Sequence, residues 1–289
     1  MMATPVHQSQ VNLSWQPATD NVAVSAYRVY RNGTLLATLG NLTEHSDSGL
    51  RAASTYSYTV SACDVVANCS AQTAAVMAVT PSAVSTLNVP QGWNLLGNAS
   101  DTPIDVGVAF SDSAQFVTLW KWLASQSVWA FYSPALAAQG GAALADYAAA
   151  KGYQVLRTIA GGEGFWVNVK QAGSVSLPLG SPVSGASLRT LMLPGWNLVA
   201  TADNATPAAF NLSLTDPLAP HPAADVVPIN LTTLWAWDNP LSKWYFYSPQ
   251  LEGQSGTALF DYTVSKGYLD FAAAGKTLGT GVGFWINKP

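Results

Sequence analysis

Side chains that usually carry out catalysis are scarce in this sequence of 289 residues. The three histidines stand at positions 7, 45 and 221, and the three glutamates at positions 44, 163 and 252. Acid–base or nucleophilic catalysis needs a titratable group or an activated nucleophile beside the reacting bond. The spacing of these residues predicts no such set and no cluster of metal ligands. We therefore expect a protein that is not an enzyme and has no catalytic residue, cofactor or metal site.

Tryptophan is the residue type that stands out instead. Ten of the eleven tryptophans lie after residue 90, five in each of two copies of one pattern. Self-similarity of this kind indicates a duplicated structural unit. The motifs recur in the same order: Gly-Trp-Asn-Leu at 92–95 and 195–198, Leu-Trp-x-Trp at 119–122 and 234–237, Phe-Tyr-Ser-Pro at 131–134 and 246–249, Lys-Gly-Tyr at 151–153 and 266–268, and Gly-Phe-Trp at 164–166 and 283–285.

The carboxylates do not form a catalytic pair in either copy. Asp146 and Asp261 are the duplicated acids, one per copy, whereas Glu163 is replaced by Val282 in the second copy. Glycoside cleavage usually needs two carboxyl groups. We expect the two aspartates to be surface charges or hydrogen-bonding groups on a helix. The glycine run at 161–164 precedes a predicted strand and lacks the lysine of a phosphate-binding loop, so we interpret it as a turn.

Aromatic surface is the chemistry that remains. Flat exposed rings suit the CH-rich faces of sugars, and two copies that bind the same polymer would gain avidity. The alternative is that all the rings of each copy pack inside it. We expect the rings near the hairpin bend to form an exposed platform: Trp122, Trp129, Tyr132, Trp237, Trp244 and Tyr247. The remaining rings are expected in the cores: Trp93, Trp120, Trp166, Trp196, Trp235 and Trp285.

Each copy is predicted to be a small α+β domain, over residues 83–182 and 188–289, with the Gly/Ser/Pro-rich segment 180–187 as a linker. The period-two aromatics at 120–122 and 129–131 indicate a hairpin with paired rings. Residues 142–152 indicate a helix that ends at Gly152, and residues 164–169 a closing strand. In the first copy a further strand-like run follows at 174–179, and its counterpart is missing from the second.

Residues 1–82 have the pattern of a β-sandwich. The run at 11–15 alternates apolar and polar residues, and Asn32-Gly33 is a strong hairpin signal. Further strands are predicted at 27–31, 34–38, 56–60 and 74–79. Short strands with turns at this spacing are typical of two packed sheets. We therefore predict a mainly β protein with three domains.

Specific residues of this region resemble the fibronectin type III modules of secreted bacterial polysaccharide-active enzymes. The resemblance spans about residues 8–81 and rests on Leu-Ser-Trp at 13–15, Thr-Asp-Asn-Val at 19–22, the run 27–33 and the run 55–60. It implies that Trp15 is a core residue and that Tyr56, six residues after Leu50, forms a tyrosine corner. The duplicated pattern resembles a repeat of large secreted bacterial multidomain proteins, which implies location and no activity.

The two cysteines, Cys63 and Cys69, lie on either side of a turn-like Ala-Asn between two predicted strands. A disulfide is feasible across the neck of such a hairpin, and the alternative is two free thiols. The first residues show no signal peptide, which leaves a cytosolic protein as one interpretation. Because of the expected disulfide, we prefer a segment of an extracellular or cell-surface protein, joined to catalytic or surface domains outside this sequence.

Charge and hydropathy exclude two classes of partner. Charged residues make up 10% of the sequence, the net charge is −4, and no basic run occurs, so nucleic acid is not expected. No apolar stretch is long enough for a membrane span. The sequence is best interpreted as a non-catalytic accessory segment that binds a polysaccharide or another cell-surface polymer. The alternatives are a structural or adhesive segment without a small ligand, and a tether to a hydrophobic polymer surface.

Overall fold

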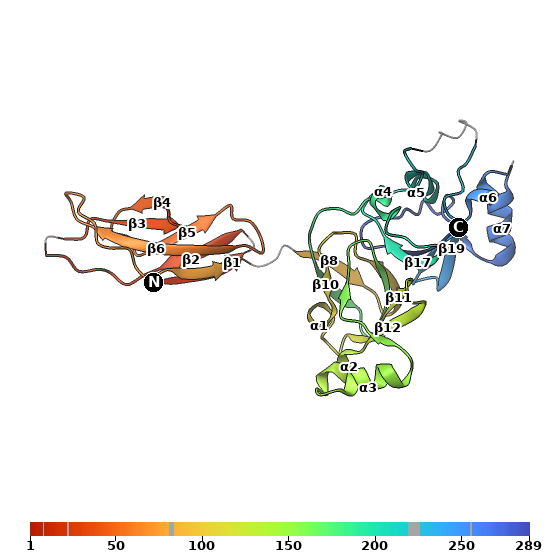
Figure 1. Cartoon of the computed structure of the whole chain (residues 1–289), viewed down its shortest axis with the longest axis horizontal. Helices are drawn as coiled ribbons and strands as arrows, with labels where there is room; N and C mark the ends of the chain where they lie inside the picture. The colour runs from red at the N-terminus through yellow and green to blue at the C-terminus, as the bar shows by residue number, and fades with distance from the viewer. Residues whose placement is uncertain (8, 22, 81–83, 219–225, 255) are drawn as a thin grey trace. The chain divides into compact units, whose positions relative to one another are not determined.

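The computed structural model describes residues 1–7, 9–21, 23–80, 84–218, 226–254 and 256–289, and strands are its main elements (Figure 1). The mainly β class predicted from the sequence is confirmed. The chain divides into two compact units, Met1–Ala83 and Val84–Pro289. We call the first the sandwich unit, and we call the second the tandem unit because it contains both copies of the repeat.

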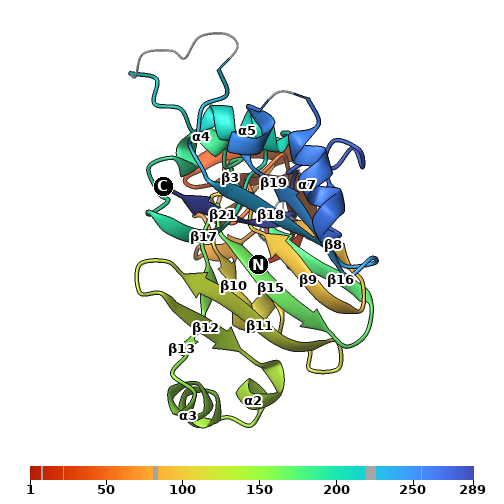
Figure 2. The ribbon, with the colours of Figure 1, turned by 90° about the vertical axis from the view of Figure 1, so that its right-hand side faces the viewer.

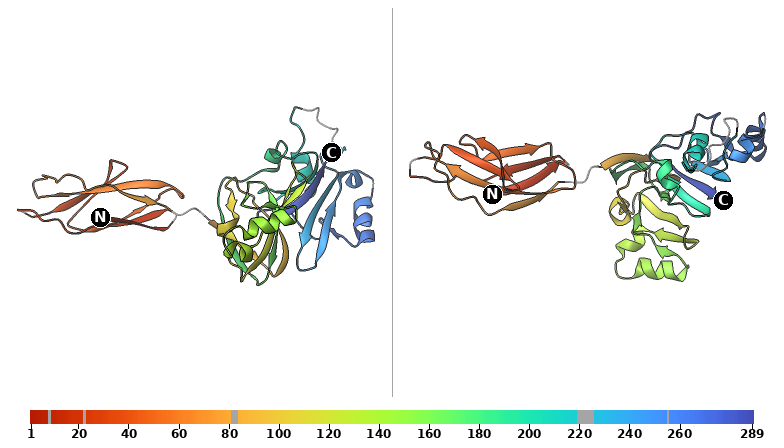
Figure 3. Two further views of the ribbon diagram at one scale, coloured as in Figure 1. Left: turned by 60° about the horizontal axis from the view of Figure 1, so that its bottom comes forward. Right: turned by 45° about the horizontal axis from the view of Figure 1, so that its top comes forward.

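The sandwich unit consists of a three-stranded sheet and a four-stranded sheet, both antiparallel (Figure 3). The first sheet has the order β1-β2-β5, and the second has the order β4-β3-β6-β7. The strands are β1 (Met2–His7), β2 (Gln10–Ser14), β3 (Ala26–Arg31), β4 (Thr34–Leu39), β5 (Glu44–Ser48), β6 (Thr55–Cys63) and β7 (Val76–Val79).

The core of the sandwich unit follows from strand alternation. Val11 and Leu13 of β2 are buried while the residues beside them are more exposed, as period two requires. Trp15 is buried, which confirms its predicted core role. The backbone N–H of Arg51 donates to the hydroxyl of Tyr56 at 2.9 Å, so the tyrosine corner is also confirmed. The sandwich unit therefore has a fibronectin type III-like fold.

Cys63 and Cys69 form the predicted disulfide. The same two residues make an antiparallel β-bridge, which places them at the neck of a short hairpin as expected. Asp64 organises the loop between them, because its Oδ1 accepts the backbone N–H groups of Val66 and Asn68, both at 2.9 Å. Local hydrogen bonds of this kind hold the two sulfurs within bonding reach.

The first copy within the tandem unit is built around a five-stranded sheet of order β13-β12-β11-β15-β9. Two further strand pairs, β10 with β14 and β8 with β16, accompany it. The strand-like run predicted at 174–179 is thus confirmed as β16. The elements are β8 (Val84–Val89), β9 (Gly92–Gly97), β10 (Ile104–Asp105), α1 (Val106–Ala109), β11 (Phe116–Leu123), β12 (Val128–Tyr132), α2 (Pro134–Ala138), α3 (Ala143–Ala150), β13 (Gln154–Val155), β14 (Thr158–Ile159), β15 (Gly164–Val169) and β16 (Gly173–Pro178).

The second copy repeats the sheet with equivalent strands in the order β20-β19-β18-β21-β17. Helix α3 lies beside β13, and its counterpart α7 lies beside β20, so each sheet has a helix next to one edge strand (Figure 2). Gly152 and Gly267 follow these helices with φ of 73° and 70°, as expected of the glycine that ends a helix. The elements are α4 (Gly185–Leu188), β17 (Gly195–Ala200), α5 (Pro207–Ser213), β18 (Thr233–Asp238), β19 (Lys243–Tyr247), α6 (Pro249–Glu252), α7 (Ala258–Lys266), β20 (Leu269–Asp270) and β21 (Gly283–Lys288).

The two copies have separate hydrophobic cores but pack into one compact unit. The sequence had instead predicted a separate domain for each copy. The sheets meet along β9 and β15 of one copy and β17 and β21 of the other. A side chain on Gly283 would collide with the backbone of Leu96, so this close approach requires glycine.

The segment between the copies is bound to the tandem unit along its length. The carboxylate of Asp101 accepts the backbone N–H of Ser181 at 2.8 Å, and the N–H of Val183 donates to the carbonyl of Ala99 at 2.9 Å. Helix α4 begins two residues later, at Gly185. The predicted linker at 180–187 is therefore a packed connection that helps to hold the copies together.

Candidate functional site

The Gly-Trp-Asn motif forms a turn that presents its tryptophan to solvent. Gly92 has a φ of 97°, a value that favours glycine, and the side chain of the buried Asn94 donates to the carbonyls of Pro90 and Gly92 at 2.8 and 3.0 Å. The ring of Trp93 is 42% exposed because it points to the side opposite Asn94, away from the core. The expectation that Trp93 is a core residue is wrong.

The second copy repeats this turn. Gly195 has a φ of 90°, and Asn197 donates to the carbonyls of Leu193 and Gly195 at 2.7 and 2.9 Å. Trp196 is 45% exposed, so its predicted core position is wrong for the same reason. In both copies the Gly-Trp-Asn motif therefore holds an exposed indole in a fixed place.

The predicted aromatic hairpins are confirmed in both copies. Trp122 lies opposite Trp129 between β11 and β12, and their ring centroids are 5.4 Å apart. Trp237 lies opposite Trp244 in the same way, with centroids 5.2 Å apart. All four rings are partly exposed. Cross-strand pairs of this kind stabilise a sheet and fix the rings on one face of it.

Two further tryptophan rings in each copy lie on the same face as the hairpin pair. Trp120 pairs across the sheet with Trp166 of β15, and Trp235 pairs with Trp285 of β21. All four are partly exposed, so none has the fully enclosed position expected of it. Strand alternation explains this arrangement, because the neighbouring Phe165 points to the opposite face and fills the core.

Tyr132 and Tyr247 do not belong to the aromatic surface. They are buried in the cores of the first and second copies, although the sequence placed them on the platform. The reason is again alternation, because Trp129 and Tyr132 are three residues apart and face opposite sides of β12. Burial raises the pKa of both phenols, and the next largest causes are the carboxylate of Asp105 near Tyr132 and the hydrogen bond from Tyr247 to Glu252.

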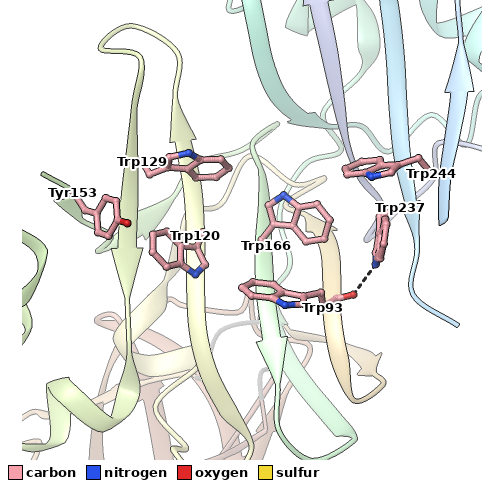
Figure 4. Close-up of a pocket in the computed structure, with 7 residues that line it drawn as sticks. All are labelled: Trp93, Trp120, Trp129, Tyr153, Trp166, Trp237 and Trp244. Atoms are coloured by element: carbon pink, nitrogen blue, oxygen red, sulfur yellow. Dashed lines mark hydrogen bonds between the residues drawn. The ribbon is translucent and has the colours of Figure 1, made fainter. Parts of the chain in front are cut away.

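The exposed rings line two hollows between the copies. The larger one has a volume of about 500 Å³ and the smaller one a volume of about 290 Å³. We call them hollow 1 and hollow 2. Hollow 1 is lined by Trp93, Trp120, Trp129, Tyr153, Trp166, Trp237 and Trp244 (Figure 4). Hollow 2 is lined by Trp122, Trp129, Trp196 and Trp285.

Hydrogen bonds between the copies fix both hollows. The indole N–H of Trp237 donates to the backbone carbonyl of Trp93 at 2.9 Å, which is the dashed line in Figure 4. The indole N–H of Trp122 donates to the carbonyl of Trp196 at 3.1 Å. Because an indole N–H is a donor only, these contacts satisfy the polar atom of each ring and leave its apolar faces to the hollow.

The tryptophans meet edge to face. Trp166 lies in the middle of hollow 1, and its ring plane is inclined by 83° to Trp93, 63° to Trp237 and 80° to Trp244 (Figure 4). Their centroids are 5.7 to 6.1 Å from that of Trp166. This tilted arrangement is the favoured one for aromatic quadrupoles, so the rings support one another without a ligand.

Lys121, Glu163 and Asp261, which lie near these sheets, have structural partners. Lys121 points to the core side of β11 and forms an ion pair with Glu163 at 2.7 Å. Glu163 also accepts the backbone N–H of Ala160, which closes the glycine turn predicted at 161–164. Asp146 and Asp261 are exposed on α3 and α7, and Asp261 accepts a hydrogen bond from Thr257. In the part of the chain that the structure describes, no three potential metal ligands cluster.

Comparisons with known proteins relate parts of the chain to enzymes that degrade polymers. Chitinase D of Niallia circulans is 44% identical over 102 residues, which are 33% of this chain and 19% of the chitinase. A poly(3-hydroxybutyrate) depolymerase of Ralstonia pickettii is 42% identical over 83 residues, which are 29% of this chain and 16% of the depolymerase. The chain thus spans less than a fifth of the length of either relative. No protein family model matches the chain.

Among solved structures, the sixth fibronectin type III domain of the human fibronectin type III domain containing protein 3 aligns with 28% of this chain and 79% of its own. The identity is 24% and the TM-score 0.25. Among the residues that the structure describes, no helix is long and apolar enough to cross a membrane.

Proposed function

We propose that this chain is a non-catalytic accessory segment of an extracellular protein and that its tandem unit binds polysaccharide through the aromatic surface between the copies. The proposed binding residues include Trp122, Trp129, Trp237 and Trp244, as expected from the sequence, and also the rings of the turn and closing-strand motifs. Tyr132 and Tyr247 are left out because they are buried. The sandwich unit would act as a spacer toward an attached catalytic or surface domain.

One observation carries this proposal. All ten tryptophans of the tandem unit are at least partly exposed, and nine of them line the two adjoining hollows. Large contiguous apolar patches are rare on soluble proteins and mark binding surfaces. In this proposal the exposed parts of these indoles contact the CH-rich faces of sugar rings, and the relationship to a chitinase fits this ligand class.

The expected strength can be bounded from the covered area. Apolar contact contributes about 25 cal/mol per Å², so a sugar face that covers roughly 40 Å² of an indole contributes about 1 kcal/mol. Contact with several indoles would offset the entropy lost when a flexible chain is held, and would give affinities in the micromolar to millimolar range. This is suited to an accessory segment that keeps a larger protein near its substrate.

The test is retention on insoluble polysaccharides. We expect the unmodified protein to sediment with cellulose, chitin or xylan, and a variant with Trp166→Ala and Trp285→Ala to lose most of this binding. Phe260→Ala is the matched control, because Phe260 is an exposed aromatic residue of α7 outside both hollows. The proposal fails if none of the polysaccharides retains the unmodified protein while its fold is intact.

The relationship to a polyester depolymerase favours a second candidate, a tether to a hydrophobic polymer. The same indoles would then contact aliphatic chain segments. Retention on films of poly(3-hydroxybutyrate) with no retention on polysaccharides would support this function in place of the first. Binding to neither polymer, together with concentration-dependent self-association in light scattering, would favour a structural or adhesive segment.

A further inference from the structure

We propose that each hollow is a composite site that needs both copies, and that each takes a single neutral glycan chain. This inference rests on the proposed function and deepens it. The repeat in the sequence suggests two independent modules, one per copy, that bind the same polymer with avidity. The contacts between the copies indicate instead that each binding site is built from residues of both copies.

The contacts between the copies are reciprocal. The N–H of Gly97 donates to the carbonyl of Gly281 at 3.2 Å, and the N–H of Ala200, the residue equivalent to Gly97, donates to the carbonyl of Gly162 at 2.9 Å. The two indole bonds described above form a second reciprocal pair. A patch that contacts its own equivalent is the hallmark of a two-fold interface. The copies therefore relate to each other as the subunits of a symmetric dimer do.

Because the copies contact each other in this reciprocal way, each hollow is lined by residues of both copies. In hollow 1, Trp93 and Trp166 come from the first copy and Trp237 and Trp244 from the second. In hollow 2, Trp196 and Trp285 come from the second copy. The other two rings of hollow 2, Trp122 and Trp129, come from the first copy. Neither copy alone holds a complete set of walls.

The chemistry of the walls points to an uncharged ligand. Tryptophan and one tyrosine are the only residues that line the two hollows in the described part of the chain. These side chains offer apolar faces but no positive charge that could pair with a carboxylate. Burying a carboxylate without a partner is costly. The hollows therefore select neutral sugars over uronic acids.

The tilt of the rings points to a single chain. In hollow 2, Trp285 is inclined by 86° to Trp196 and by 79° to Trp129, so the rings share no common plane. A flat crystalline surface could contact only the edges of such an array. A separate chain can enter a hollow and meet a different ring face with each sugar. Soluble oligosaccharides should therefore bind, and not only solid polymers.

The experiment compares two double variants. One removes two rings of the same hollow, and the other removes two rings of the same copy. Trp93 and Trp244 belong to different copies but line the same hollow, hollow 1. Trp196 and Trp244 belong to the same copy but line different hollows. Trp93→Ala with Trp244→Ala should leave hollow 2 intact, whereas Trp196→Ala with Trp244→Ala should damage both hollows. Truncating Trp93 or Trp196 keeps the hydrogen bonds between the copies, because their acceptors are backbone carbonyls.

Binding is measured by titration calorimetry with cellohexaose and chitohexaose, and hexagalacturonate serves as the charged comparison. We expect the Trp93/Trp244 variant to retain about half of the binding capacity, and the Trp196/Trp244 variant to bind at least about tenfold more weakly. If Trp244→Ala unfolds the unit, Trp244→Phe replaces it.

The reverse ranking of the two variants would show independent modules and overturn the composite site while leaving the proposed function standing. Equal binding of hexagalacturonate would overturn the assignment to neutral glycans. No binding of any soluble or insoluble polysaccharide by the unmodified protein would overturn both this inference and the proposed function.

Discussion

The junction between the copies can be tested by adding one methyl group to Gly283. A Cβ at this position would come too close to the carbonyl oxygen, carbonyl carbon and nitrogen of Leu96 in the other copy. These are backbone atoms of a strand, so the junction cannot relax by a rotamer change. Overpacking of this kind usually costs about 1 to 3 kcal/mol.

For a unit of this size, each kcal/mol shifts the melting temperature by roughly 2 to 4 °C. We therefore expect Gly283→Ala to lower the melting temperature of the tandem unit by about 2 to 12 °C in differential scanning calorimetry. The transition of the sandwich unit should be unchanged, because that unit is compact by itself. Glycan binding should fall as well, since both hollows depend on the junction.

Gly253→Ala is the control for this experiment. A Cβ there would have only ordinary contacts, and Gly253 has a φ of −71°, which any residue adopts. Its effect should be close to zero or slightly stabilising. If Gly283→Ala and Gly253→Ala had the same melting temperature as the unmodified protein, the close packing of the copies at Leu96 would be refuted.

Three further expectations concern single contacts. Replacing Cys63 and Cys69 with serine should destabilise the sandwich unit by about 2 kcal/mol in urea denaturation, because the disulfide closes a short loop. A stability equal to that of the oxidised protein would contradict this. Asn94→Ala removes both side-chain hydrogen bonds of the turn that holds Trp93. The free energy of unfolding should fall by about 1 to 3 kcal/mol, and oligosaccharide binding should weaken. Unchanged calorimetric and binding curves would argue against that role. Burial, and then the bond to Glu252, raises the pKa of Tyr247, so the folded state holds this proton more tightly than the unfolded state; stability should be complete below pH 10 and fall as the pH rises further. Tyr247→Phe should reduce this alkaline loss, and an unaltered pH profile would count against it.

The parts of the fold that the sequence predicts well are those set by local patterns. Alternation and the Asn32-Gly33 turn were enough for β2, β3 and β4, and the tyrosine corner at Tyr56 was implied by the resemblance to fibronectin type III modules. Strand β5 was missed because Glu44–Ser48 is polar throughout and its pairing with β2 comes from its place in the sandwich. Pairing with a distant strand leaves no periodic signal in such a segment.

The candidate site was predicted in part, for reasons that strand geometry makes clear. The hairpin rings were found because they repeat with period two beside a turn. Tyr132 was placed wrongly although its position relative to Trp129 already puts it on the opposite face. Trp93 was assigned to the core because a glycine and apolar strand residues lie near it in the sequence. In the structure Gly92 and Asn94 form a turn that directs the indole outward.

The sequence did not predict that each hollow is lined by residues of both copies. A repeat shows that two segments fold alike, but it does not show which faces they turn toward each other. The signal was present in small residues: Gly97 and Gly283 lie where strands of the two copies approach closely. Without coordinates, such glycines are indistinguishable from those that serve a turn.

Joining two equivalent halves in one chain has an evolutionary consequence that a true homodimer lacks. In a homodimer every substitution appears on both sides of the axis, whereas here each half can change alone. Asn239 of the second copy donates to the carbonyl of Gln91 and to the side chain of Asn94, while the first copy has Ala124 at the equivalent place. A glycan chain has two chemically different ends. Because the two copies can accumulate different substitutions, the surface between them is free to become asymmetric and to favour one orientation of such a chain.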